Sequence, residues 1–267
     1  MDIFQALILA LIQGITEFLP ISSSGHLILP SEVLNWPDQG LAFDVAVHVG
    51  TLSAVLIYFR QDVAQIIAGG FATLSGNFSH PQGKLAWMIV LATIPAGLSG
   101  LFFNDFIEAN LRSATVIATT TIVFGILLGL ADVNSRKTKT LIEIGLISAL
   151  VIGCAQALAL IPGTSRSGIT ITAALFLGFS RDASARFSFL ISIPVIILSG
   201  GYKGLELVGQ TGIDWVFISV GVLCSAISAY LCIYFFLSFI NRIGMMPFVY
   251  YRLVLGLALV AMIVMQT

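Results

Sequence analysis

Charged residues are scarce in this sequence of 267 residues, and their scarcity excludes a soluble globular domain. Lys and Arg total 12, Asp and Glu total 13, and together they make up 9% of the chain. Hydrophobic residues make up 58%, and the mean hydropathy is +1.02. Too few charges remain to solvate a globular surface of this size. The composition therefore predicts an integral membrane protein.

The sequence also lacks the patterns of three other protein classes. Its apolar runs are continuous and show no alternation of inward and outward residues, which excludes an outer-membrane barrel. It has no basic patch with interleaved aromatic residues, so we expect no nucleic-acid partner. The cysteines Cys154, Cys224 and Cys232 are odd in number and lack ligand spacing, which favours small core residues over disulfides or a metal site.

Long apolar runs are abundant, and they predict membrane-spanning helices. The runs that approach or exceed the roughly 20 residues needed to cross a bilayer core lie at 86–103, 114–131, 141–161, 215–239 and 248–265. Another span is expected at 43–59, whereas the apolar pieces at 22–34, 63–74 and 167–179 are too short to cross alone. The run at 3–19 lacks the basic start and the cleavage site of a signal peptide, so we expect it to be structural.

Two polar breaks interrupt the apolar sequence and resemble each other. The first reads QGITEFLPISSSGH at 13–26, and the second reads QALALIPGTSRSG at 156–168. Paired interrupted segments indicate inverted repeats whose broken helices meet near the bilayer midplane, although two polar turns can also be alike by chance. We expect an all-α polytopic helix bundle with two re-entrant helix hairpins. It would form one transmembrane domain, 1–267, with repeats at roughly 1–110 and 141–267 joined by the span 114–131.

The few basic residues allow a prediction of topology. The loop at 132–140 carries Arg136, Lys137 and Lys139, and cytoplasmic loops are enriched in Lys and Arg. With this loop inside, the first hairpin would enter the membrane from outside and the second from the cytoplasm. The two breaks would then meet within the membrane.

Arg166 stands in the second break, within one of the most apolar regions of the chain. An arginine at the bilayer centre costs roughly 2.5 to 3.5 kcal/mol on insertion scales, so it needs a partner, and Glu17 in the first break is the natural candidate. A purely structural ion pair is the alternative to a functional site. The breaks carry more donors and acceptors than one pair uses: Ser22, Ser23, Ser24, His26, Thr164, Ser165 and Ser167. Burying them unsatisfied costs about 1 to 3 kcal/mol each, so we expect a hydrated polar cavity of ligand size.

The residue types in the breaks favour phosphate chemistry. Each break ends at the start of a half-helix, where free N–H groups and the helix dipole favour an anion, and Arg166 adds a planar fork suited to phosphate. Gln13 and Glu17 share one helix face, so Glu17 is a candidate general base or, with Gln13, a ligand of a divalent cation. Ser23 is a candidate nucleophile, and His26 could activate it or protonate a leaving group. Attack by water or by His26 itself is the alternative.

Both breaks resemble signatures of the undecaprenyl-diphosphate phosphatase family of the bacitracin-resistance type. The first signature is Glu or Gln, three residues and Glu, followed by Pro-hydrophobic-Ser-Ser-x-Gly-His. The second is Pro-Gly-x-Ser-Arg-Ser-x-x-Thr, and PGTSRSGIT matches it at every specified position. The similarity in length and hydropathy covers essentially the whole chain. It implies an enzyme that removes the terminal phosphate of undecaprenyl diphosphate and so recycles the lipid carrier for peptidoglycan synthesis.

The resemblance also implies a set of site residues. The catalytic residues would be Glu17, Ser23, His26 and Arg166, and the substrate-binding residues Gln13, Ser165, Ser167 and Thr170. The residue types in the breaks themselves add further substrate-binding candidates, namely Ser22, Ser24, Gly163 and Thr164. A divalent cation, Mg²⁺ or Ca²⁺, would bind Glu17 and Gln13. Because Gln13 stands where other members carry Glu, this sequence weakens any cation site that needs two carboxylates there.

The expected partners and location follow from the same resemblance. We expect a polyprenyl diphosphate substrate and membrane lipids as partners, and a homodimer is left open. The implied location is the bacterial plasma (inner) membrane, with several spans and a site open to the extracytoplasmic side.

Two alternatives were weighed against this hypothesis. A secondary transporter or flippase for an anionic, phosphate-bearing solute would also use inverted repeats with half-helix termini. It needs no nucleophile, however, and the placement of Ser23 and His26 near Glu17 favours an enzyme. The acid-phosphatase type of lipid phosphatase needs a Ser-Arg followed by a histidine, and this sequence has no histidine after His80, so that alternative is excluded.

Overall fold

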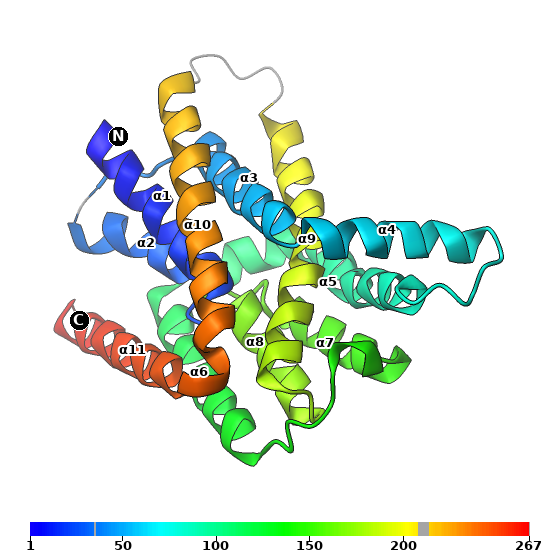
Figure 1. Ribbon diagram of the computed structural model, residues 1–267. Coiled ribbons are helices and arrows are strands. Elements are labelled where there is room, and N and C mark those ends of the chain that lie inside the picture. Colours follow the sequence, from blue (N-terminus) through cyan, green and yellow to red (C-terminus); the bar gives the residue numbers. More distant parts are fainter. Residues whose placement is uncertain (35, 208–213, 267) are drawn as a thin grey trace.

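The computed structural model describes residues 1–34, 36–207 and 214–266 (Figure 1). Its helices are, in chain order, α1 (Ile3–Phe18), α2 (Ser23–Leu34), α3 (Leu41–Tyr58), α4 (Arg60–Leu74), α5 (Gly83–Asn110), α6 (Ala114–Asn134), a 3₁₀ turn η1 (Leu141–Glu143), α7 (Leu146–Leu158), α8 (Arg166–Phe176), α9 (Arg181–Glu206), α10 (Trp215–Ile243) and α11 (Met246–Gln266). Apart from one parallel β-bridge between Lys139 and Phe179, the regular elements of the described residues are helical. The predicted all-α fold is confirmed.

Six helices in the described part of the chain are long and apolar enough to cross a membrane, namely α3, α5, α6, α9, α10 and α11. Large apolar side chains cover their outer faces. Phe102 on α5 is 72% exposed, Leu223 on α10 is 62% exposed and Val254 on α11 is 68% exposed. Large apolar side chains exposed to this degree on the outer faces of several helices are unfavourable in water but suit contact with lipid tails. The chain is therefore a multi-pass membrane protein.

The predicted span at 141–161 is wrong, because polar bonds break it near its start. The Glu143 carboxylate accepts hydrogen bonds from the Thr140 backbone N–H at 2.6 Å and from the Thr140 hydroxyl at 2.8 Å, which closes a separate 3₁₀ turn. Helix α7 begins only after Gly145 and has 13 residues, too few to cross a bilayer. The three short apolar pieces of the sequence correspond to the short helices α2, α4 and α8.

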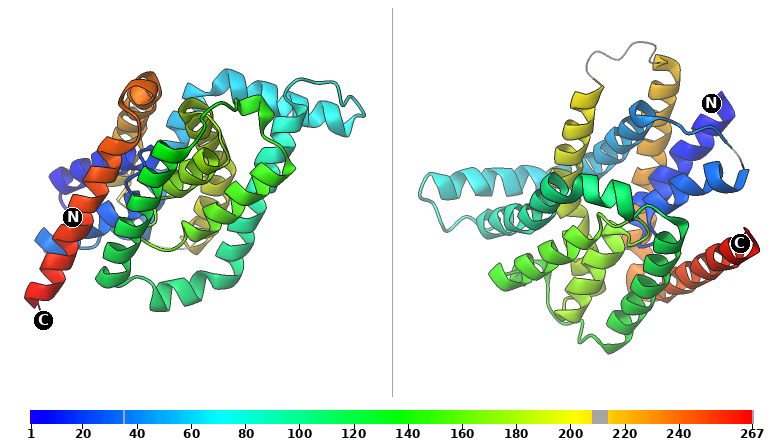
Figure 2. Two further views of the ribbon diagram at one scale, coloured as in Figure 1. Left: turned by 90° about the horizontal axis from the view of Figure 1, so that it is seen from below. Right: turned by 180° about the vertical axis from the view of Figure 1, so that it is seen from behind.

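The two breaks join short helices into two pairs, α1 with α2 and α7 with α8. Figures 1 and 2 show the first pair in the upper half of the molecule, as drawn in Figure 1, and the second pair in the lower half. Helix α1 packs against α10, and α7 packs against α5. The entry of each pair from an opposite side of the bilayer, and the boundaries of the repeats, stay predictions.

Glycines bring both leading helices close to their neighbours. A Cβ on Gly14 of α1 would lie 2.6 Å from the Ser225 carbonyl oxygen of α10, and a Cβ on Gly153 of α7 would lie 2.6 Å from the Ala92 carbonyl oxygen of α5. Small residues of this kind allow helix backbones in a membrane to approach closely. The breaks that follow α1 and α7 are thereby fixed to long helices.

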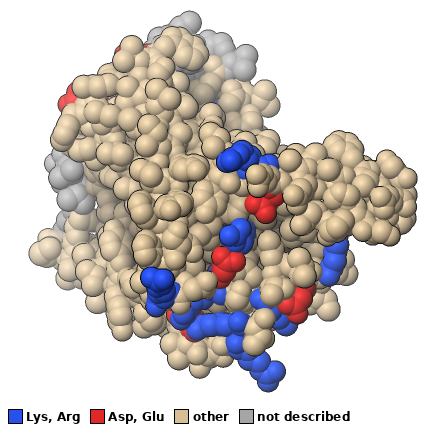
Figure 3. Space-filling view, viewed as in Figure 1, with Lys and Arg blue, Asp and Glu red and all other residues tan. Residues whose placement is uncertain are grey.

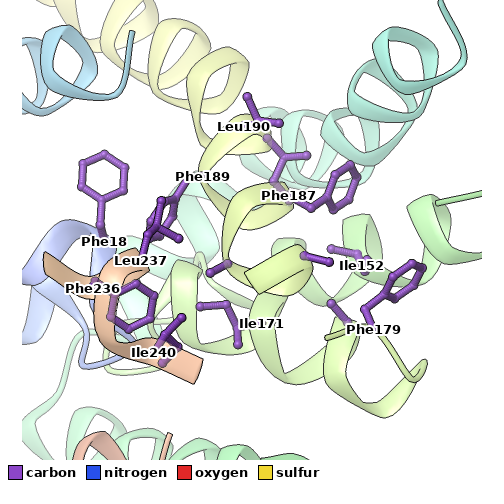
Figure 4. Close-up of a cluster of buried hydrophobic side chains, with 14 of the residues drawn as sticks. Phe18, Ile152, Ile171, Phe179, Phe187, Phe189, Leu190, Phe236, Leu237 and Ile240 are labelled. Atoms are coloured by element: carbon purple, nitrogen blue, oxygen red, sulfur yellow. The ribbon is translucent and has the colours of Figure 1, made fainter. Parts of the chain in front are cut away.

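The apolar core lies beside the breaks, between α1, α8, α9 and α10 (Figure 4). Phe18, the last residue of α1, is fully buried and meets Phe189 of α9 edge to face, with ring centroids 5.1 Å apart. Phe189 also contacts Phe236 of α10 at 5.7 Å. Because Phe18 directly follows Glu17, this aromatic packing fixes the end of α1 and the direction of the Glu17 side chain.

Basic side chains gather at one end of the molecule, toward the bottom of Figure 3. There Asp132 of α6, which is 2% exposed, binds Arg181 of α9 through two hydrogen bonds of 2.6 and 2.8 Å. Lys137 lies 3.3 Å from the same carboxylate, which also accepts the Met245 N–H at 3.1 Å. This end therefore joins α6, α9 and α11, and its assignment to the cytoplasm stays a prediction.

Candidate active site

The Glu17 carboxylate is the centre of a polar cluster at which the two breaks meet. Its Oε2 accepts hydrogen bonds from the Ser23 hydroxyl at 2.8 Å and from the Gln13 side-chain amide at 2.9 Å. Its Oε1 pairs with Arg166 Nη2 at 3.0 Å. Glu17, Ser23 and Gln13 belong to the first break, and Arg166 belongs to the second. The predicted pairing of Glu17 with Arg166 is confirmed.

Local structure explains how α1 presents two of these groups. Gln13 and Glu17 lie four residues apart and therefore on the same face of the helix. The helix ends at Phe18 because Leu19 is extended, with φ −73° and ψ 147°, and Pro20 follows. The chain then reverses, so that Ser23 becomes the first residue of α2 and points back at Glu17.

Both half-helices begin after a serine in a left-handed conformation. Ser22 has φ 75° and Ser165 has φ 71°, a backbone conformation that residues other than glycine rarely adopt. The hydroxyls of Ser22 and Ser24 lie 3.3 Å apart, and those of Ser165 and Ser167 lie at the same distance. The two breaks therefore share one backbone design, in which the first helical residue follows a sharp reversal.

The structure gives the register between the breaks. One constant offset relates Gln13 to Gln156, Ser22 to Ser165, Ser24 to Ser167 and Gly25 to Gly168. Only the prolines fall out of this register, by one residue. The same offset relates Ser23 to Arg166, so that the first residues of the two half-helices occupy equivalent positions and bind opposite oxygens of one carboxylate.

Arg166 is held by both halves of the molecule. Besides the Glu17 carboxylate it contacts the Glu17 backbone carbonyl at 3.4 Å and the Ser188 carbonyl of α9 at 3.3 Å. Its guanidinium lies 5.9 Å from the centre of the Phe18 ring. The Ser188 hydroxyl is in turn 2.7 Å from the Thr170 hydroxyl of α8. The Arg166 side chain is only 12% exposed, so these contacts fix its direction.

The half-helix ends beside Glu17 and Arg166 favour an anion. Glu17 and Arg166 offset each other, which leaves the N-terminal ends of α2 and α8 as positive dipole ends beside the pair. At the start of α8 the Ser165 hydroxyl accepts the Gly168 N–H at 3.1 Å and so caps part of that end. The remaining free N–H groups suit the oxygens of a phosphate.

Comparison with known proteins identifies the family. The family model described as bacitracin resistance protein BacA matches residues 6–258. The chain belongs to this family. It is 65% identical over 263 residues, covering 98% of this chain and 99% of the other, to an undecaprenyl-diphosphatase of Saccharophagus degradans. It is also 64% identical over 260 residues to one of Teredinibacter turnerae, with 97% and 98% covered, and 59% identical over 262 residues to one of Aliivibrio salmonicida, with 98% of each chain covered.

Within this BacA-family fold the predicted site residues fall into two groups. The first group is Glu17 with the three residues that bind its carboxylate, namely Gln13, Ser23 and Arg166. The others line the breaks: Ser167 donates to the Leu19 carbonyl at 2.7 Å across the two breaks, Thr170 reaches Ser188, and Ser22, Ser24 and Ser165 bond within their own turns. Many of these polar groups bind one another, but Gln13 Oε1 and Thr164 Oγ1 are buried without a hydrogen-bond partner, and the hydrated cavity stays a prediction. The role of each residue stays a prediction.

His26 lies differently from the sequence-based picture, in which it stands beside Ser23. Its Nδ1 is 2.7 Å from the Ser22 carbonyl oxygen, and its Nε2 is 2.6 Å from the Tyr251 hydroxyl of α11. A carbonyl oxygen can only accept, so Nδ1 carries a proton and Nε2 of the neutral ring accepts from Tyr251. The two rings also stack, with centroids 5.5 Å apart. His26 therefore faces α11 and the adjoining groove.

That groove lies directly beside the cluster. It has a volume of about 460 Å³ and is lined by Ile12, Ile15, Thr16, Leu19, Ile21, His26, Pro247, Phe248 and Tyr251. Nearly all of these side chains are apolar or aromatic, and His26 and Tyr251 supply its polar groups. The groove thus joins an apolar wall to the polar cluster, which suits a ligand with an apolar tail and a charged head.

Sequence analysis missed three residues that the structure brings to the breaks: Ser188, Tyr251 and Arg252. Ser188 and Tyr251 have no signal in the sequence, because only packing places α9 and α11 next to the breaks. Arg252 did have one, since it is a lone arginine in the predicted span at 248–265. The reasoning that selected Arg166 applies equally to it.

Proposed function

We propose that this protein hydrolyses undecaprenyl diphosphate to undecaprenyl phosphate and inorganic phosphate. The observation that carries the proposal is the hydrogen bond from Ser23 Oγ to Glu17 at 2.8 Å, with Arg166 on the other oxygen of that carboxylate. A hydroxyl bound to a carboxylate, beside an arginine, supplies a nucleophile, a base and an anion ligand. The names of the three relatives agree with this activity. A transporter has no use for the Ser23–Glu17 pair.

Ser23 acts as the nucleophile in this mechanism. Its Oγ attacks the terminal phosphorus, Glu17 takes the hydroxyl proton, and the bond from phosphorus to the bridging oxygen breaks. Undecaprenyl phosphate leaves with the bridging oxygen and with the proton that Glu17 passes to it, so the carboxylate is restored and the phosphoryl group remains on Ser23. Water then attacks this phosphoserine while Glu17 takes a proton from the water. The bond from phosphorus to Ser23 Oγ breaks, Glu17 returns that proton to Oγ, and inorganic phosphate leaves.

Arg166 and the half-helix N–H groups bind the diphosphate. The planar guanidinium of Arg166 can bind two phosphate oxygens at once. Because Arg166 and Ser23 begin their half-helices at equivalent positions beside Glu17, both act on the same phosphoryl group. Only part of the Arg166 fork is engaged by Glu17, so the remaining N–H groups are available to substrate. His26 stands at the mouth of the groove. Once Tyr251 releases its Nε2 and that nitrogen takes up a proton, His26 donates a hydrogen bond to the leaving oxygen.

The prenyl tail occupies the apolar groove between α1 and α11. Its lining side chains Ile12, Ile15 and Ile21 are aliphatic, and Phe248 adds an aromatic wall. Burial of isoprene units there is favourable by about 25 cal/mol per Å² of apolar surface. The groove begins at His26, next to the diphosphate, so the tail extends from the site directly toward lipid.

A divalent cation, Mg²⁺ or Ca²⁺, completes the proposed site. The fit rests on Gln13, whose Oε1 is buried without a hydrogen-bond partner next to Glu17. The described residues contain no group of three His, Cys, Asp or Glu suited to a metal. Gln13 and Glu17 would therefore hold the ion together with oxygens of the diphosphate, as is usual for these hard cations. The ion would offset the charge of the phosphate oxygens.

The protein is placed in the bacterial inner membrane, with the site open to the extracytoplasmic side. The basic end around Asp132 and Arg181 is then cytoplasmic, as loops rich in Lys and Arg usually are. In that location the reaction returns the lipid carrier to peptidoglycan synthesis. Removal of the diphosphate form would also account for the bacitracin resistance in the family description.

Release of inorganic phosphate from a C15 or longer prenyl diphosphate in detergent tests the proposed function. We expect turnover by the wild type and a loss of about 10³-fold in kcat for Ser23→Ala. Ser31→Ala is the matched control, because Ser31 lies on the same half-helix and bonds only the Ile28 carbonyl, at 2.8 Å. Acid quenching during turnover should trap phosphoserine at position 23, detectable by mass spectrometry.

Two outcomes would separate the claims. Absence of phosphate release by the folded wild type, together with transport of the lipid between leaflets in vesicles, would overturn the enzyme in favour of a flippase. A Ser23→Ala variant that works at the rate of the control would remove only the serine nucleophile.

Chelation tests the cation. We expect EDTA to abolish phosphate release and added Mg²⁺ or Ca²⁺ to restore it. Gln13→Ala should raise the cation concentration needed for half-maximal rate by about tenfold, since it removes one oxygen ligand. Full activity in EDTA would exclude the cation, whereas an unchanged cation requirement in Gln13→Ala would exclude Gln13 alone.

A further inference from the structure

Arg252 on α11 is a fully buried arginine, with 0% of its surface exposed. Its guanidinium donates only to backbone carbonyls. These are Thr121 at 3.1 Å, Pro20 at 3.3 Å, Thr164 at 3.0 Å, Thr120 at 3.3 Å and Gly163 at 2.9 Å. Such a set satisfies the donors of the group completely.

These five carbonyls come from three separate segments. Pro20 lies in the first break, Gly163 and Thr164 lie in the second, and the other two lie on α6. Pro20 stands three residues before Ser23, and Thr164 stands two residues before Arg166. One guanidinium therefore binds both breaks just ahead of the residues that bind Glu17.

The charge of Arg252 has no carboxylate to offset it among the described side chains. The ion pairs formed by these residues involve Lys137, Arg166, Arg181 and Arg186, and none includes Arg252. Burying a charge without a counter-ion is unfavourable even when its hydrogen bonds are made. The dipoles of the five carbonyl groups stabilise the buried positive charge in part but do not neutralise it.

The first turn of α8 makes the burial of the Arg252 charge still less favourable. A Cβ on Gly168, in the first turn of α8, would lie 2.9 Å from Arg252 Nη1. The guanidinium therefore sits against the positive end of the α8 dipole, where a cation is disfavoured. An uncharged amide has only two donors and could not bind these five carbonyls, so the arginine brings a positive charge to this place together with its hydrogen bonds.

We propose that Arg252 is a positioning residue of the diphosphate site. It holds the two breaks together so that Ser23 and Arg166 both reach Glu17. Because Glu17 offsets the charge of Arg166, the positive charge of Arg252 is not neutralised, and it attracts the diphosphate to the site without touching it. This inference rests on the proposed phosphatase function. It assigns to Arg252 no contact with substrate.

Geometry and charge can be separated by two substitutions. Arg252→Lys keeps the charge but cannot bind carbonyls of three segments at once, so kcat should fall at least tenfold while KM and the inhibition constant of inorganic phosphate stay within threefold of the wild type. Arg252→Gln loses the charge as well, so both constants should also rise at least tenfold. Arg242→Gln, at an exposed position on α10, is the control for loss of a positive charge. All values are taken per folded protein, judged by elution as a single species and by thermal unfolding.

A second pair of variants leaves Arg252 in place. Gly168→Ala should push the flexible end of the Arg252 side chain away from the Thr164 carbonyl while the chain still folds, and we expect a fivefold or greater loss of kcat. Gly100→Ala on α5 is the control for the same substitution inside a helix away from the breaks, where a Cβ would meet nothing within 4 Å. We expect it to lose less than twofold.

The outcomes distinguish failure of this inference from failure of the proposed function. Lys and Gln variants that fold and differ in neither kcat nor the phosphate constant would show a structural role only and overturn the inference. Equal activities of Gly168→Ala and Gly100→Ala would overturn it even if no Arg252 variant folds. Absence of phosphate release by the wild type would instead overturn the function on which it rests.

Discussion

The two breaks have nearly the same backbone but different chemistry. Ser22 and Ser165 adopt the same left-handed conformation, and each is followed by a half-helix. Position by position, however, the first break offers Glu17 and Ser23 where the second has Leu160 and Arg166. The base and the hydroxyl come from one break and the guanidinium from the other.

This difference explains why the site needs both breaks. Two identical breaks would bring together like charges, or no charge at all, whereas the observed pair gives one carboxylate with a hydroxyl on one oxygen and an arginine on the other. A duplicated backbone can supply two half-helix ends for an anion. Asymmetry between the copies then supplies the groups that react.

The largest expected effect is that of Glu17→Gln, which removes the carboxylate that the first break has where the second has the uncharged Leu160. The variant keeps the size of the side chain but cannot take the Ser23 proton, so kcat should fall about 10³-fold. Rates of phosphate release measure it, with Leu160→Met as the control at the equivalent position. A loss of less than tenfold would show that Glu17 is not the base.

Arg166→Lys tests the contribution of the second break. A lysine is a point charge and cannot serve the Glu17 carboxylate, the Ser188 carbonyl and a phosphate together, so kcat/KM should fall about 10²-fold. Arg186→Lys is the matched control, since Arg186 pairs with Asp182 on its own helix at 3.0 Å, lies over the Phe59 ring and contacts neither break in the part of the chain that the structure describes. If both substitutions change kcat/KM equally, the fork of Arg166 has no special role.

The smallest effect concerns the turns themselves. The Ser165 hydroxyl accepts the Gly168 N–H and caps α8, whereas the Ser22 hydroxyl contacts Ser24. We expect Ser165→Ala to reduce the free energy of unfolding by about 1 kcal/mol and Ser22→Ala to reduce it by less. Thermal unfolding in detergent compares the two. Equal losses would mean that both serines cap their half-helices alike.

Much of the site was predictable from the sequence because unusual residues stand out against an apolar background. Glu17 and Arg166 are conspicuous for this reason, and their pairing follows from the need to neutralise buried charge. The span at 141–161 was predicted wrongly because hydropathy does not register the turn that Glu143 closes on Thr140. Arg252 was overlooked although it carried the same signal as Arg166.

The sequence by itself determined the class of protein, the two breaks and the residue types that they carry, because composition and local turn chemistry depend on neighbours along the chain. Only the tertiary structure decided that Ser23 and Arg166 face one carboxylate, that His26 turns toward Tyr251 and that Arg252 lies behind both breaks. These contacts join residues up to 232 positions apart. Such contacts depend on how helices pack, through close approaches such as that of Gly14 to α10. A small residue marks a face where another helix can approach closely, but its neighbours along the chain do not say which helix that is.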